Sequence, residues 1–316
     1  LYRKADSVRE QYVGNDIYLR GIVEFSNYCG KNCNYCGIRG ANAAVERYRM
    51  TQGEIVETAK DIEKREQTTV VLQSGEDPYY TREIMGDIIS AIRRETHLAI
   101  TLSVGTRDID TYAYWKEKGM DRYLLRFETS NVDLFKNCHP DDTLDERISC
   151  LRILKDLGVQ TGSGFLIGMP GETKEDLAED IIFCTKLDLD MVGIGPFITH
   201  DKTPFSGKKN PFNKDMFVKV IAILRLLNKK AHIPATTAYD AVFSDGRDRA
   251  LQAGANIFMP NATGAKYRKN YLLYPGKPCV DESGDDCAAC VIGRIKALGR
   301  FPGKGPGHSL KQRFLE

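Results

Sequence analysis

The chain lacks the features of several specialised classes of protein. No apolar run approaches the roughly 20 residues that span a bilayer, and no repeat or low-complexity block interrupts the 316 residues. The net charge is only +2, whereas proteins that bind nucleic acid or a membrane surface usually carry a concentrated basic patch. The five histidines form no H-x-x-H or H-x3-H pattern of a metal site. We therefore expect an ordinary globular protein that binds neither nucleic acid nor a membrane.

Cysteine, by contrast, is plentiful and clustered. Six of the nine cysteines fall in two short triplets, which indicates metal ligation in a reducing cytoplasm rather than a secreted disulfide framework. The first triplet is Cys29, Cys33 and Cys36, spaced C-x3-C-x2-C. Three thiolates on one short loop can hold three irons of a cubane [4Fe–4S] cluster and leave the fourth iron open. Zinc would need a fourth ligand nearby, and no other Cys or His lies between residues 1 and 96.

The second triplet, Cys279, Cys287 and Cys290, is spaced C-x7-C-x2-C in a loop rich in glycine and acidic residues. We interpret it as the ligand set of an auxiliary iron–sulfur cluster, [2Fe–2S] or [4Fe–4S], whose fourth ligand is not a protein side chain. A labile site partly occupied by zinc is the alternative. The other cysteines have no partner at ligand spacing, and Cys150 and Cys184 are most simply buried thiols.

Apolar and β-branched runs alternate with polar turns and amphipathic stretches along most of the chain. The predicted strands are 17–25, 69–72, 99–102, 122–126, 160–167, 191–196, 233–236 and 255–259. Capping boxes mark two helix starts, at Thr51 and Thr143. About eight strands alternating with helices is the pattern of an α/β protein with a (β/α)8 TIM-type barrel. We place this barrel and a short helical lead-in in residues 1–275. Residues 276–316 form a C-terminal extension with the second cysteine loop and a flexible tail.

Unusual residues follow the predicted strands, where a barrel of this kind builds its active site. The first cysteine loop comes after the first strand, Ser74-Gly75-Glu76-Asp77 after the second, and Glu128 after the fourth. The other residues at strand ends are Ser103, Gly105, Gly168-Met169-Pro170-Gly171, Pro196, Thr236, Thr237 and Asn261. Because the carboxyl ends of the strands meet at one end of the barrel, we expect these residues to surround a single site.

The cysteine loop closely resembles that of the radical S-adenosylmethionine (SAM) superfamily, both in its spacing and in its missing fourth ligand. The resemblance implies that Cys29, Cys33 and Cys36 are the catalytic ligands of a [4Fe–4S] cluster. The open iron of such a cluster binds the amino and carboxylate groups of SAM. One electron from the cluster then cleaves SAM into methionine and a 5′-deoxyadenosyl radical.

Two further features fit the same family. Ser74-Gly75-Glu76 resembles its GGE motif, whose backbone binds the SAM amino group and whose glycine permits close approach. Tyr35 occupies the family's aromatic position near the SAM adenine. The simpler alternatives are a turn that starts a helix for the first feature and a packing aromatic for the second.

Four more residues are candidates for contact with SAM. Glu128 can accept hydrogen bonds from the ribose hydroxyls, and Arg147 can fork onto the methionine carboxylate. A lone arginine is otherwise usually part of the solvated surface. Gly168 and Met169 lie in GFLIGMPGE, which loosely resembles the family's G-x-I-x-G-x-x-E segment beside the adenine. Tight strand-to-helix geometry is the alternative for these glycines.

Longer blocks resemble one branch of the biotin synthase and methylornithine synthase-like group, the HydE family of [FeFe]-hydrogenase maturases. They include VLQSGEDPYY, DMVGIGPFI, IPATTA and LYPGKPC, and the similarity is collinear nearly from Val13 to Gly303. The SGEDPYY block also occurs in methylornithine synthases, so an enzyme acting on a free amino acid is one alternative. A non-catalytic iron–sulfur or zinc scaffold is another. Phe127 stands where we expect a histidine in this family, a departure that bears on the polarity around the substrate.

The HydE resemblance implies an enzyme that helps to assemble the diiron subcluster of the hydrogenase active site from a cysteine-bound iron carbonyl–cyanide substrate. The maturases HydG and HydF would be its partners, and ferredoxin or flavodoxin its electron donor. Inward-facing arginines need a partner, and a bound anion supplies one. The candidate residues for the anionic substrate are Arg122, Arg126, Thr236, Thr237 and Tyr271. A structural arginine–carboxylate network is the alternative for Arg122.

Overall fold

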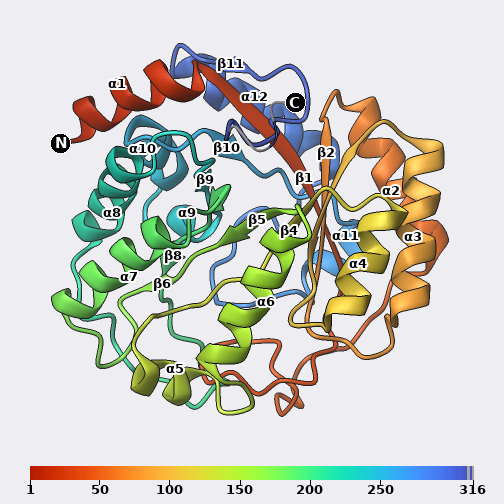
Figure 1. Cartoon of the computed structure of the whole chain (residues 1–316), viewed down its shortest axis with the longest axis horizontal. Coiled ribbons are helices and arrows are strands. Elements are labelled where there is room, and N and C mark those ends of the chain that lie inside the picture. The colour runs from red at the N-terminus through yellow and green to blue at the C-terminus, as the bar shows by residue number, and fades with distance from the viewer. Residues whose placement is uncertain (312–313, 315–316) are drawn as a thin grey trace.

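The computed structural model describes residues 1–311 and 314; residues 312, 313, 315 and 316 of the predicted tail lie outside the described part. Within that part, eight parallel strands follow one another in the order β7-β5-β4-β3-β2-β1-β10-β9 (Figure 1). A parallel bridge between Met191 and His232 joins the two ends of this path and closes the barrel. The strands are β1 (Asp16–Ser26), β2 (Thr69–Ser74), β3 (Ala99–Ser103), β4 (Arg122–Leu124), β5 (Gln160–Ser163), β7 (Met191–Val192), β9 (Pro234–Ala235) and β10 (Ile257–Phe258). The predicted (β/α)8 barrel is confirmed.

Two predicted strands are interrupted at glycines. The chain leaves the barrel wall after β5 and after β7, and resumes as β6 (Leu166–Ile167) and β8 (Gly195–Pro196), which pair with each other. Between them Gly164 and Gly193 are in such close contact that a Cβ on Gly164 would lie 2.0 Å from the Gly193 carbonyl oxygen. The short β6–β8 pair therefore extends the carboxyl end of the barrel, where the site residues lie.

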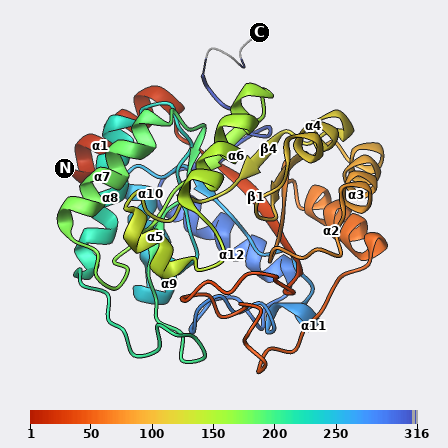
Figure 2. The same ribbon diagram turned by 60° about the horizontal axis from the view of Figure 1, so that its bottom comes forward.

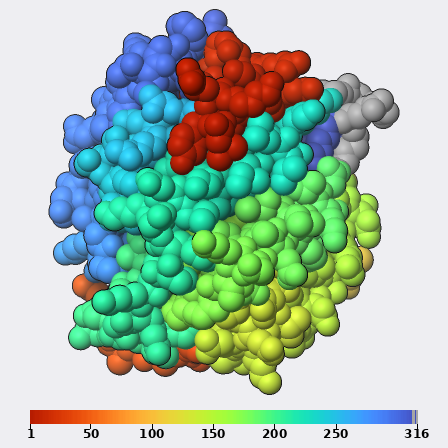
Figure 3. All heavy atoms as spheres, turned by 90° about the vertical axis from the view of Figure 1, so that its left-hand side faces the viewer, coloured from red at the N-terminus to blue at the C-terminus, as the bar shows by residue number. Residues whose placement is uncertain are grey.

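Helices surround the barrel on the outside (Figure 1). They are α1 (Tyr2–Val13), α2 (Gln52–Lys64), α3 (Arg82–Glu95), α4 (Ile109–Lys118), α5 (Val132–Cys138), α6 (Leu144–Asp156), α7 (Lys174–Lys186), α8 (Lys214–Leu227), α9 (Ala238–Val242), α10 (Gly246–Gln252), α11 (Ala265–Arg268) and α12 (Gly284–Ala297). The predicted capping boxes at Thr51 and Thr143 start α2 and α6. The N-terminal α1 packs across α8 on the outer surface (Figure 3). Among the described residues, no helix combines the length and the apolar character needed to cross a membrane.

The C-terminal segment covers the amino ends of the strands. β11 (Phe301–Pro302) pairs with the start of β1. Beyond it, the carbonyl oxygen of Gly307 accepts a hydrogen bond from Arg20 at 3.0 Å, and Ser309 is 2% exposed. The prediction of a flexible tail therefore does not hold for residues 303–309, which close the end of the barrel opposite the site.

Candidate functional site

The first cysteine triplet lies on the loop of residues 27–51 that connects β1 to α2. This loop runs beside α11 in Figure 2, and Tyr48 stacks on Tyr267 of α11 with ring centroids 4.6 Å apart. Arg47 braces the loop from within, because its guanidinium donates to the carbonyl oxygens of Ile38 at 2.8 Å and Arg39 at 2.6 Å. The wholly buried Asn27 accepts a hydrogen bond from the Tyr48 N–H at 2.8 Å. The loop is thus held in shape by its own polar side chains.

The three thiols are set in a poorly solvated pocket. Burial and, to a lesser extent, the nearby Cys29 raise the pKa of Cys36 to about 12. Burial and both neighbouring thiols also raise the pKa of Cys33 well above its usual value. Bound cations reverse this effect, because they stabilise the thiolate form. Three thiolates on one loop can each bind a different iron of a cluster.

The end of β2 packs directly on this loop. The Gly30 N–H donates to the Glu76 carbonyl oxygen at 2.8 Å. A Cβ on Gly75 would lie 2.3 Å from the Tyr28 carbonyl oxygen and 2.7 Å from the Cys29 Cβ. Only glycine fits here, because such a short approach leaves no room for a side chain. Ser74-Gly75-Glu76 therefore touches the first cysteine, as the sequence predicts for a SAM-binding strand end.

Arg147 lies in a buried charge network beside the same loop. Its guanidinium pairs with Asp142, lies 3.7 Å from Glu76 Oε1 and donates to the Arg126 carbonyl oxygen at 3.2 Å. Asp142 also pairs with Lys31 of the cysteine loop at 2.6 Å. Arg147 is 5% exposed, and its Nε–H has no hydrogen-bond partner among the described residues. A buried donor without an acceptor is costly, so this position is suited to an anionic ligand.

Glu128 and Tyr35 form a second part of the site. The Tyr35 hydroxyl oxygen lies 3.1 Å from Glu128 Oε1, and Arg126 pairs with Glu128 Oε2 at 2.8 Å. Glu128 has φ of 66°, which is uncommon outside glycine and is found mostly where function requires it. His139 also contacts this group, with Nε2 at 3.2 Å from the Tyr35 hydroxyl and Nδ1 at 3.2 Å from Cys33 Sγ. No spacing pattern in the sequence points to His139, which comes 106 residues after Cys33.

Gly168 and Met169 lie on the other side of Tyr35. Met169 and Tyr35 pack into one small apolar cluster with Phe197 and Phe205. The Met169 N–H donates to Glu172 Oε2 at 2.8 Å, so this backbone donor is already occupied. The segment can therefore offer an apolar surface next to Tyr35.

Thr237 and Tyr271 lie beside a buried ion pair that the sequence does not reveal. Thr236 instead donates a hydrogen bond to the Ile194 carbonyl oxygen at 3.0 Å. Lys277 Nζ lies 2.5 Å from Glu24 Oε1, and both side chains are 5% exposed. Lys277 also donates to the Tyr271 carbonyl oxygen at 2.9 Å. The Thr237 hydroxyl shares a 3.0 Å hydrogen bond with the Tyr274 hydroxyl. The two charged partners are 253 residues apart, which explains why no sequence pattern reveals them.

Arg122 is not brought to this site. It lies at the amino end of β4, where its guanidinium donates to Thr69 Oγ1 at 3.2 Å and to the Pro306 carbonyl oxygen at 2.7 Å. The role of these contacts is structural, but the partners are neutral oxygens rather than the carboxylates of the predicted alternative. Phe127 likewise points away from the substrate side, because it is fully buried against Phe183 of α7. It therefore does not set the polarity around the substrate.

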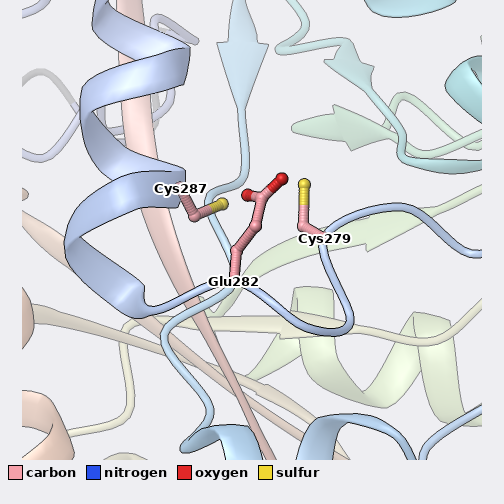
Figure 4. Close-up of side chains that lie close together, drawn as sticks. All are labelled: Cys279, Glu282 and Cys287. Carbon is pink, nitrogen blue, oxygen red and sulfur yellow. The ribbon is translucent and has the colours of Figure 1, made fainter.

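The second cysteine loop places a carboxylate between two thiols (Figure 4). One ligand atom each of Cys279, Glu282 and Cys287 lies within 4.8 Å of the others, and Cys290 is exposed and outside this group. Glu282 Oε2 is a buried atom without a hydrogen-bond partner. A hydrogen bond from the Cys279 thiol lowers the pKa of Cys287 to about 6, which favours its thiolate. The structure brings Cys279 and Cys287 together, as two of the three predicted ligands, and adds Glu282, which the sequence does not single out.

This second cysteine pair faces the interior of the barrel. A cavity of about 20 Å³ is lined by Cys279 and Cys287 together with Thr237, Glu24 and Lys277. A cavity of this size can hold one water molecule. The second cysteine loop thus adjoins Thr237, one of the candidate substrate residues.

Comparison with known proteins places this geometry in a family. The family described as the radical SAM superfamily matches residues 23–184. The chain is also 46% identical, over 97% of its length, to the [FeFe] hydrogenase maturase subunit HydE of Thermotoga maritima, of which it covers 88%. The chain belongs to the radical SAM superfamily and to its HydE family. The predicted resemblance and the predicted class of enzyme are thereby confirmed.

Three further similarities are informative. The 3-methylornithine synthase of Methanosarcina barkeri is 32% identical over 81% of this chain and 73% of that enzyme. The crystal structure of methylornithine synthase (PylB) has a TM-score of 0.83 at 28% identity, covering 96% of this chain and 88% of that one. The hydrogenase maturase HydG has the same fold, with a TM-score of 0.78 at 18% identity, over 96% of this chain and 68% of that one.

The residues present fit the cofactors that the radical SAM family implies. Cys29, Cys33 and Cys36 supply three half-buried thiols on one loop. Beside them, Gly75 leaves no room for a Cβ, and the Arg147 Nε–H is buried without a partner. These features fit a cluster that binds the amino and carboxylate groups of SAM.

Proposed function

We propose that this protein is a HydE-type radical SAM maturase that acts in assembly of the diiron subcluster of [FeFe]-hydrogenase. One observation carries the proposal: the cysteine loop, the glycine strand end at Gly75 and the Tyr35–Glu128 pair meet in a single site at the carboxyl end of the barrel. A scaffold protein that only binds metal would not need this arrangement beside its cysteines.

Cys29, Cys33 and Cys36 would hold a [4Fe–4S] cluster, with SAM on the open iron. The cluster and SAM, bound together at this loop, would supply a 5′-deoxyadenosyl radical. The Gly75 backbone would approach the SAM amino group, because no side chain intervenes. Arg147 would orient the SAM carboxylate through its unpaired Nε–H.

Glu128 would bind SAM, and Arg126 would bind the anionic substrate. The Glu128 carboxylate, already positioned by Tyr35 and Arg126, would accept the ribose hydroxyl hydrogen bonds. Arg126 is about a quarter exposed, so its guanidinium can reach an anion in the barrel interior. Thr236, Thr237 and Tyr271 would complete the binding of a cysteine-bound iron carbonyl–cyanide substrate. The closed wall would limit access of water to the radical.

We place an auxiliary metal centre at Cys279 and Cys287, with Cys290 as the ligand predicted from the sequence and Glu282 as the one nearest in space. The partners would be HydG, which supplies the substrate, HydF, which accepts the product, and a low-potential electron donor such as ferredoxin or flavodoxin. A cytoplasmic location would suit such oxygen-sensitive centres.

The test is anaerobic reconstitution with iron and sulfide, reduction, addition of SAM, and quantification of 5′-deoxyadenosine by mass spectrometry. The reaction is run with and without the cysteine-bound iron carbonyl–cyanide substrate. We expect 5′-deoxyadenosine formation to rise with that substrate. No product from a fully loaded, reducible cluster would contradict radical SAM activity.

A second candidate is a methylornithine synthase-like enzyme that acts on a free amino acid. The TM-score of 0.83 to methylornithine synthase favours it. In the same assay, 5′-deoxyadenosine formation that responds to a free amino acid and ignores the iron substrate would support this second function.

A further inference from the structure

His139 bridges the cluster loop and the candidate SAM-binding side chains. Its Nδ1 lies 3.2 Å from Cys33 Sγ, and its Nε2 lies 3.2 Å from the Tyr35 hydroxyl. The side chain is 3% exposed, and its ring stacks on Phe135 with centroids 4.9 Å apart. The imidazole therefore has a fixed orientation, with one nitrogen toward each partner.

The hydrogen positions between Cys33, His139 and Tyr35 can be assigned from the chemistry of iron ligation. Once Cys33 binds iron, its sulfur carries no proton and can only accept a hydrogen bond. The hydrogen between Cys33 and His139 must then lie on Nδ1. A neutral imidazole has one N–H, so when Nδ1 carries that hydrogen, Nε2 is an acceptor.

Tyr35 is the donor that this acceptor requires. Its hydroxyl lies within reach of both His139 Nε2 and Glu128 Oε1. Glu128 does not depend on it, since Arg126 contacts Oε1 at 3.1 Å and Oε2 at 2.8 Å. The Tyr35 hydrogen can thus be given to His139 without leaving the Glu128 carboxylate unpaired.

We propose that His139 is a positioning residue that donates its Nδ1–H to the sulfur of Cys33 and accepts the Tyr35 hydroxyl hydrogen. The ring thereby couples a cluster ligand to the side chains that face SAM. This inference rests on the proposed cluster at the cysteine loop, but not on the identity of the substrate. Hydrogen bonds to cluster sulfurs stabilise the reduced, more negative cluster and raise its reduction potential.

The test is the reduction potential of the reconstituted holoenzyme without SAM, measured by an anaerobic titration followed by electron paramagnetic resonance. His139→Phe keeps a ring that can stack on Phe135 and removes both nitrogens. In His139→Phe we expect the ratio of reduced to oxidised cluster at a fixed potential to fall roughly tenfold, because this variant lacks a hydrogen bond to a charged group. For a one-electron couple this is a shift of 59 mV to more negative potential.

Two amide variants separate the hydrogen bond from packing. His139→Asn places an N–H near the position of Nδ1 and should stay close to the wild-type potential. His139→Gln places its amide near the position of Nε2 and should shift as His139→Phe does. His97→Phe, at an exposed position, is the control and should leave the potential unchanged. If His139→Phe does not load iron, the contrast between the asparagine and glutamine variants decides.

The outcomes are distinct from those for the proposed function. A wild-type protein that loads no reducible cluster would overturn both. A wild-type cluster with an unchanged potential in His139→Phe, or equal potentials in the two amide variants, would overturn the role of His139 and leave radical SAM chemistry intact.

Discussion

Replacing Gly75 with alanine tests whether close backbone contact between β2 and the cysteine loop is needed. The added Cβ would lie 2.3 Å from the Tyr28 carbonyl oxygen and 2.7 Å from the Cys29 Cβ. Neither neighbour is the end of a flexible side chain, so the loop itself must move. Overpacking of this kind costs about 1–3 kcal/mol. We expect the free energy of unfolding of Gly75→Ala to fall by about that amount.

The displacement should also reach the chemistry, because Cys29 is one of the three cluster ligands. We expect fewer irons per chain after reconstitution, and a drop in 5′-deoxyadenosine formation larger than the drop in iron content. Urea denaturation of the apo-protein measures the free energy of unfolding. Iron analysis measures the irons per chain, and mass spectrometry measures 5′-deoxyadenosine formation. Gly53→Ala on the exposed face of α2, where no atom lies within 4 Å of the new Cβ, is the matched control. It should raise the stability by about 0.4–1 kcal/mol and leave the activity unchanged.

A Gly75→Ala protein with wild-type stability, iron content and SAM cleavage would refute this reasoning. It would mean that the loop accommodates a methyl group freely, and that the short distances at Gly75 do not reflect a functional constraint.

Three further predictions concern other parts of the molecule. Cys33→Ser should abolish 5′-deoxyadenosine formation, whereas Cys287→Ser should reduce it only mildly; complete loss in the second variant would contradict an auxiliary role for that centre. Burial raises the pKa of Glu172 from 4.5 to about 8, so the folded chain keeps a proton that the unfolded chain releases above about pH 4.5. The stability of the wild type relative to Glu172→Gln should therefore fall between about pH 4.5 and 8 and stay constant above, as urea midpoints at pH 5, 7 and 9 would reveal; a difference that does not change with pH would exclude this shift. Arg122→Gln should lower the free energy of unfolding by about 1–3 kcal/mol through unpaired buried acceptors without changing SAM affinity, whereas Arg126→Gln should impair SAM cleavage; equal loss of SAM affinity in both would place Arg122 at the site after all.

Much of this protein could be predicted from the sequence because the signals are local. Three thiols within eight residues define a cluster loop wherever that loop lies, and the glycine after β2 reports a close approach by its lack of a side chain. Capping boxes at Thr51 and Thr143 are completed within one helical turn. The alternation of strands and helices gave the barrel, because only a few topologies satisfy it.

What only the tertiary structure decided depends on contacts between distant segments. Arg126 and Arg122 are four residues apart in one strand region, yet the first faces the site and the second is held by the C-terminal segment at the other end of the barrel. His139 joins Cys33 across 106 residues, and Glu282 takes the place near Cys279 where the spacing suggests Cys290. Sequence spacing fixes which residues can be neighbours within a turn or a loop. Which end of a strand a side chain serves, and which distant partner satisfies it, is set by the packing of the whole barrel.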